Sequence, residues 1–70
     1  MKPFKVHYKL SEVLKGEHFI QRGLVLYRKT EDGYKVVDTA FGEDPNLEIE
    51  QDEIVEIVNP HEWYYTTEEN

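Results

Sequence analysis

The sequence contains no cysteine, and its 70 residues include only four glycines, three prolines and one tryptophan. Without cysteine the chain has no disulfides, thiolate nucleophiles or cysteine-ligated zinc or iron–sulfur centres. The glycines are too scattered for a phosphate-binding loop. No apolar run approaches the roughly 20 residues of a membrane-spanning helix, and the first residues do not resemble a secretory leader. We therefore expect a cytoplasmic protein that does not enter a membrane.

The sequence also has few residues arranged for catalysis. Its only serine, Ser11, lies outside any Gly-x-Ser-x-Gly motif. The three histidines, His7, His18 and His61, lack the short spacings with which two imidazoles bind one metal ion. Carboxylates are plentiful, but a domain of this length leaves little interior for a substrate pocket. We expect no enzymatic activity, no metal and no cofactor.

Basic residues are missing from the second half of the chain. Residues 1–35 carry all eight Lys and Arg residues and four acids, a net charge of +4, whereas residues 36–70 carry eleven acids, a net charge of −11. Both halves also contain regularly spaced apolar residues, so we expect one domain in which basic and acidic side chains pair across strands. The alternative is that the two halves contact different partners.

An alternating pattern is present at the start of the chain. Phe4, Val6, Tyr8 and Leu10 fall on one side of an extended segment, with charged or polar residues on the other. This period of two predicts a half-buried strand. The next residues, 11–16, form either one helical turn or, as we favour, an irregular excursion between strands.

Two apolar segments flank the strongest turn signal in the sequence. The segment 19–29 is rich in Ile, Val, Leu and Tyr and predicts a strand, with Gly23 at a bulge. Asp-Gly within Thr30–Gly33 then predicts a β-hairpin, in a two-residue or four-residue loop. Both loops place Leu26 on the same face as Val37, whereas a three-residue loop, which we disfavour, would set it against Asp38.

The remaining segments alternate between loop and strand. Residues 41–46 predict a loop because Gly, Asp, Pro and Asn cluster there. Alternation predicts a short strand at 47–50, and four β-branched residues predict another at 54–58, with a turn at 51–53 between them. After Asn59, a possible N-cap, Pro60 and Glu62 suit the first turn of a short terminal helix that carries Trp63, Tyr64 and Tyr65.

These segments together predict an all-β domain with a short helical turn near the C-terminus. About five short strands in this order suit a small SH3-like barrel, and a strongly bent β-meander is the alternative. We expect one β domain over residues 1–66 and a flexible acidic tail over residues 67–70.

Because the catalytic motifs are absent, binding is the function class that we favour. We expect a small non-enzymatic interaction module or regulatory protein that binds another protein or itself. The candidate contact residues are of the types enriched at interfaces: Tyr27, Arg28, Lys29, Tyr34, Trp63 and Tyr64. For Trp63 the competing interpretation is a core residue that closes one end of the domain.

Two other functions fit the charge pattern. The basic half interleaves Lys and Arg with aromatic residues, as single-strand nucleic-acid binders do, although the net charge of −7 disfavours this partner. Alternatively, the carboxylates of the second half imitate a row of phosphates and inhibit a DNA-binding protein.

Overall fold

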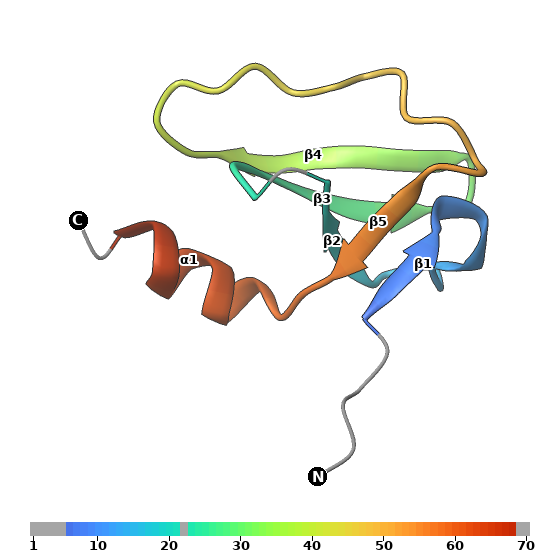
Figure 1. Cartoon of the computed structure of the whole chain (residues 1–70), viewed down its shortest axis with the longest axis horizontal. Coiled ribbons are helices and arrows are strands. Elements are labelled where there is room, and N and C mark those ends of the chain that lie inside the picture. Colours follow the sequence, from blue (N-terminus) through green and yellow to red (C-terminus); the bar gives the residue numbers. More distant parts are fainter. Residues whose placement is uncertain (1–5, 22, 69–70) are drawn as a thin grey trace, which may run out of the picture.

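The computed structural model describes residues 6–21 and 23–68 as one sheet with a C-terminal helix (Figure 1). The elements are β1 (His7–Lys9), η1 (Leu10–Glu12), β2 (His18–Ile20), β3 (Val25–Thr30), β4 (Gly33–Thr39), β5 (Ile54–Ile57) and α1 (Pro60–Glu68). All strand pairs are antiparallel, in the order β1-β5-β2-β3-β4. The predicted all-β fold with a C-terminal helical element is confirmed, and closure of the sheet into a barrel stays a prediction.

The alternation that predicts the first strand is confirmed in β1 and its continuation. Leu10 is fully buried and Tyr8 is half-buried, whereas His7 and Lys9 are exposed. Phe4 lies outside the described residues. Beyond Lys9, η1 forms a single 3₁₀ turn, so most of the segment to residue 17 is the irregular excursion that we favoured.

The predicted single strand over residues 19–29 is wrong, because the chain reverses within it. Phe19 in β2 pairs with Tyr27 in β3, so the two halves of the segment form a hairpin. Gly23 has a φ of 96° and lies in the connection rather than at a bulge. Glycine suits this position because L side chains rarely adopt positive φ.

The β3–β4 hairpin has the predicted register only near its turn. Lys29 pairs with Tyr34, the register that a four-residue loop gives, but Thr30 and Gly33 also pair, so the loop consists of Glu31 and Asp32 alone. Further along, an irregularity shifts the register so that Leu26 opposes Asp38 and Val37 is the extra residue. The expectation that Leu26 shares a face with Val37 is therefore wrong: Leu26 is fully buried and Val37 is 38% exposed.

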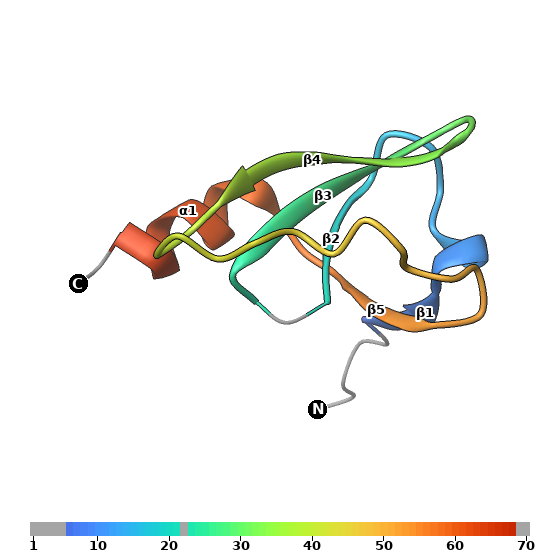
Figure 2. The same ribbon diagram turned by 90° about the horizontal axis from the view of Figure 1, so that it is seen from above.

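The predicted strand at 47–50 is also wrong, because no strand of the described residues pairs with this segment. Side-chain oxygens accept from its neighbouring backbone N–H groups instead: the Tyr27 hydroxyl from Asn46 and the Tyr34 hydroxyl from Ile49, both at 2.8 Å. Seen from above, the segment crosses over β3 and β2 on its way to β5 (Figure 2). Ile49 is buried, so the alternation reports burial against the sheet and not strand pairing.

The two faces of the sheet are covered by different elements. On one, here called the loop face, Phe19, Tyr27 and Val55 belong to a continuous apolar cluster that is covered by segment 41–53. The rings of Phe19 and Tyr27 stack with their centroids 5.2 Å apart. The opposite face, here called the helix face, is partly covered by α1, which lies on the other side of β2 and β3 (Figure 1).

Helix α1 begins where the sequence predicts. The Asn59 side chain accepts a hydrogen bond from the His61 N–H at 2.9 Å, and Pro60 is the first helical residue. The helix continues to Glu68, so Thr67 is helical, although we expected the tail to begin there. Within residues 6–21 and 23–68, no helix has the length and apolarity needed to cross a membrane.

Candidate interaction groove

A groove of about 410 Å³ opens on the helix face between α1 and the strands β2 and β5. Ile20 and Val58 line it from the sheet, and Trp63 and Thr66 line it from the helix. It is larger than the two openings on the loop face, of about 230 and 340 Å³. This feature, here called the helix groove, is an apolar surface that the fold leaves open.

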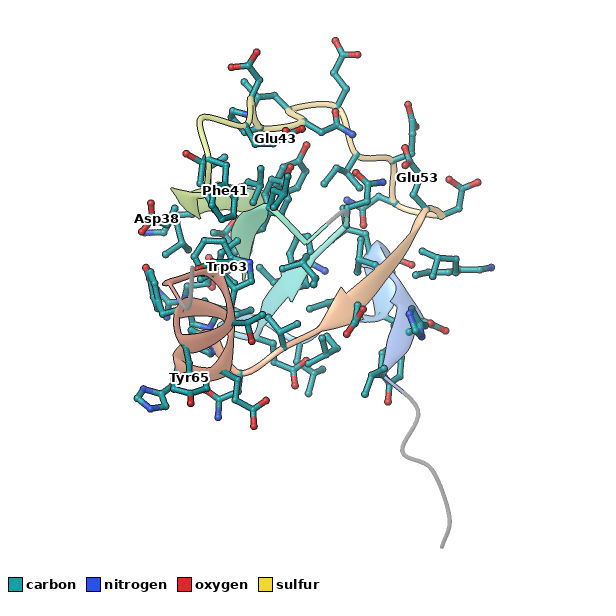
Figure 3. The ribbon with its side chains drawn as sticks, turned by 60° about the vertical axis from the view of Figure 1, so that its left-hand side comes forward. Asp38, Phe41, Glu43, Glu53, Trp63 and Tyr65 are labelled. Atoms are coloured by element: carbon teal, nitrogen blue, oxygen red, sulfur yellow. The ribbon has the colours of Figure 1, made fainter. Side chains whose placement is uncertain are left out.

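Trp63 forms one wall of the helix groove and attaches α1 to the sheet. Its side chain is only 6% exposed, and its indole N–H donates to the Gly23 carbonyl at 2.8 Å. Figure 3 shows Trp63 directed from the helix toward the strands and Tyr65 on the outer side. Trp63 is therefore a core residue, the interpretation that competed with partner contact in the sequence analysis. Tyr64 packs edge-on against it, with ring centroids 5.0 Å apart.

The helix presents small polar residues where an apolar stripe is expected. Residues three and four positions apart share one face of a helix, which places Thr66 and Thr67 beside Trp63, and all three line the groove. Core-facing helices normally carry apolar residues at such positions. Because threonine is small, Thr66 and Thr67 leave the groove open beside Trp63.

The charged residues of the helix groove are of one sign. Glu56 projects from β5 and Glu62 from the first turn of α1, and none of the described lining residues is Lys or Arg. Among the described residues, the side chain that pairs with them is His7, whose Nε2 lies 3.7 Å from Glu56 Oε1. The groove therefore combines an apolar floor with an acidic rim.

Two of the predicted contact residues face the core. Tyr27 is 2% exposed, which contradicts its prediction as a surface residue, and its hydroxyl also donates to the Asn46 carbonyl at 3.2 Å. Tyr34 is half-buried, and its ring meets that of Tyr27 edge-on. Both rings are held by the segment above them, because each hydroxyl accepts from a backbone N–H of that segment.

The two predicted cationic contacts also differ from each other. The Lys29 ammonium donates to the carbonyls of Leu10 and Val13, at 2.9 and 3.0 Å, and so fixes the turn at η1. Arg28 is exposed on the helix face. Of the six candidates, only Arg28 combines a charged group with an exposed position, and it does not line the helix groove.

Arg28 belongs to a row of basic side chains across three strands. The register sets it opposite His18 on one side and Lys35 on the other. Partial burial lowers the pKa of His18 below its ordinary value, and the positive charge of Arg28 lowers it further. Aromatic stacking does not extend this row, because Tyr27 and Tyr34 face the opposite side of the sheet.

The expected pairing between the basic and acidic halves is largely missing. Within the described part of the chain, the ion pairs are Lys15 with Glu31, both from the first half, and His7 with Glu56. The reason is the register, which places basic residues beside one another on β2, β3 and β4. The acidic segment 43–53 lies over the loop face instead (Figure 1), whereas Glu56 and Glu62 share the helix face with this basic row.

Comparison of the chain with protein-family models, curated protein sequences and solved structures finds no match. Within the described residues, no group of three His, Asp or Glu side chains is placed to hold a metal ion. Sequence reasoning missed Ile20, Glu56, Glu62 and Thr66 as parts of one site. The spacing of Trp63, Thr66 and Thr67 was the one signal that could have indicated an incompletely filled helix face.

Proposed function

We propose that this chain is a cytoplasmic, non-enzymatic interaction module that binds another protein in the helix groove. The single observation that supports this role is an open apolar groove beside a tryptophan, a residue type enriched at interface hot spots. Ile20 and Val58 offer a partner apolar contact at fixed positions beside the buried Trp63, because β2 holds Ile20 and the Val58 N–H donates to the His18 carbonyl.

For the architecture we propose the SH3-like barrel expected from the sequence. Its support is the strand order, in which the last strand lies between the first and second and β2, β3 and β4 form a meander. An experimental structure in which β1 and β4 remain distant edges would favour an open sheet instead.

The test of the proposed function is a capture experiment with matched variants. Thr66→Leu should fill the groove and keep the helix, because leucine is larger and a better helix former. Glu48→Gln alters the exposed segment over the loop face and is the control. We expect a partner protein, identified by mass spectrometry, to be retained by the native chain and by Glu48→Gln and lost with Thr66→Leu.

Retention of the same partner by Thr66→Leu would contradict the proposal. The alternative functions give different results in this experiment. Nucleic acid that co-purifies and is released by salt would support the basic half as the contact, and competition between this chain and DNA for a basic protein would support DNA mimicry.

A further inference from the structure

The helix groove carries charge as well as apolar surface, and the charge restricts what can occupy it. Both Glu56, from the sheet, and Glu62, from the helix, line it. Carboxylates at the rim of an apolar groove favour a cation placed next to an apolar side chain, and they oppose an acidic partner through repulsion. The chain's net charge of −7 acts in the same direction at longer range.

We infer that the helix groove binds an extended basic segment of a partner protein, in which a large aliphatic side chain is flanked by Lys or Arg. The inference rests on the proposed function and names the chemistry of the partner. The aliphatic side chain would lie against Ile20 and Val58, beside Trp63, and the flanking cations would approach Glu56 and Glu62. Lys and Arg suit this arrangement because their apolar stems lie along apolar surface while their charged ends stay in water.

The groove also has room for such a side chain without rearrangement. Ile20 and Val58 are half-buried in the free protein, so part of their apolar surface is already accessible. Thr66 and Thr67 supply no large side chain that would have to move aside, and the Thr67 hydroxyl already donates to the Trp63 carbonyl at 3.0 Å. Binding would therefore cover an existing surface.

Trp63 is the only tryptophan in the chain and lies in the wall of the groove, so its fluorescence reports occupancy directly. The probe is a short peptide of alternating Leu and Lys, without aromatic residues. A peptide with Glu in place of Lys tests the sign of the charge, and one with Ala in place of Leu tests the apolar contact. We expect the Leu/Lys peptide to cause a saturable change in Trp63 fluorescence and either analogue to cause little change.

Variants in which glutamines replace the glutamates show where the peptide binds. The double variant Glu56→Gln/Glu62→Gln should weaken binding of the Leu/Lys peptide about three- to ten-fold, as expected for two exposed charge pairs. The matched control, Glu48→Gln/Glu50→Gln, removes the same charge from the segment over the loop face and should change binding less than about two-fold. Thr66→Leu should abolish the fluorescence change.

Equal weakening by both double variants would overturn the inference, because the attraction would then be general and not local to the groove. Equal binding of the Glu analogue would also overturn it. If Lys2→Gln/Lys5→Gln strengthened peptide binding, the chain's own first residues would be the occupant, and concentration-dependent dimerisation blocked by Thr66→Leu would assign the groove to a second copy. Either result would contradict the inference that a different protein occupies the groove.

The two proposals fail in different ways. If no Leu/Lys peptide binds but Thr66→Leu still releases a captured partner, the inferred chemistry is wrong and the proposed function stands. If the peptide binds in the groove but no captured protein depends on it, the inferred chemistry stands and the proposed function is wrong.

Discussion

The two faces of the sheet are covered in different ways. The loop face is covered by a long segment that is fixed at several points, including hydrogen bonds from Asn46 and Ile49 to tyrosine hydroxyls. The helix face is covered by one short helix whose only buried side chain within the described residues is Trp63. An isolated helix of this length is marginal in water, so α1 depends on that attachment. The comparison teaches that one face is built for stability and the other retains accessible apolar surface.

The largest effect should come from the loop face. Phe19→Ala removes a fully buried ring that contacts Tyr27 and Tyr34, and a cavity of this kind costs about 3–5 kcal/mol. Because a small domain has about 5–15 kcal/mol of stability, urea denaturation should show a large fall or complete unfolding. Val37→Ala, in an exposed bulge, is the control and should stay within about 0.5 kcal/mol of the native chain. Equal effects of the two changes would refute the division of roles.

On the helix face, Trp63→Ala should release α1 and leave the sheet folded. The expected cost is about 2 kcal/mol, less than for Phe19→Ala, because only the helix loses its contact with the sheet. Circular dichroism should show lost helical signal at temperatures where the strands persist. Simultaneous loss of strand and helix signals would mean that the helix is part of the central cooperative unit.

A smaller effect is expected from the tyrosine hydroxyls. Tyr27→Phe keeps the buried ring but removes the acceptor at 2.8 Å from the Asn46 N–H and the donor to its carbonyl. An unsatisfied backbone group costs about 1–3 kcal/mol. Urea denaturation should show a loss in this range. An unchanged midpoint would indicate that water replaces the hydroxyl and that the segment is held in another way.

The smallest effect concerns His18. Its pKa is lower in the folded chain than its ordinary value of 6.5, so the unfolded chain binds more protons in the pH range just below 6.5. The contribution of His18 to stability should therefore fall as the pH drops through 6.5 toward the folded pKa. In Arg28→Gln, NMR titration should give a higher pKa for His18, still below the ordinary value because burial is the larger cause. A pKa unchanged by this substitution would show that Arg28 has no influence.

Local patterns predicted local structure. The alternation ending at Leu10, the Thr30–Gly33 turn and the start of the helix after Asn59 were confirmed because each depends on neighbouring residues. The segment 47–50 was predicted wrongly for the same reason: alternation reports that Ile49 is buried, and a strand or a segment crossing a sheet gives the same pattern.

The candidate site could not be predicted because contacts between residues far apart in the sequence create it. Ile20 and Glu56 come together only because β5 pairs with β2, a pairing that no local motif indicates. Tyr27 was predicted as a contact because tyrosine is enriched at interfaces. Its burial depends on a hydroxyl partner, the backbone of Asn46, that belongs to a distant loop. Arg28 was correctly expected at the surface, since a charged group in a strand faces water unless it is paired.

Native-state hydrogen exchange tests the difference between the two faces most directly. We expect the amides of α1 to exchange through a local opening of low free energy, and those of β2 and β3 only through global unfolding. The opening of α1 should also be insensitive to low urea concentrations, because it exposes little surface. Equal protection of helix and strands, converging on one free energy, would contradict the account, because the helix face would then be as firmly closed as the loop face.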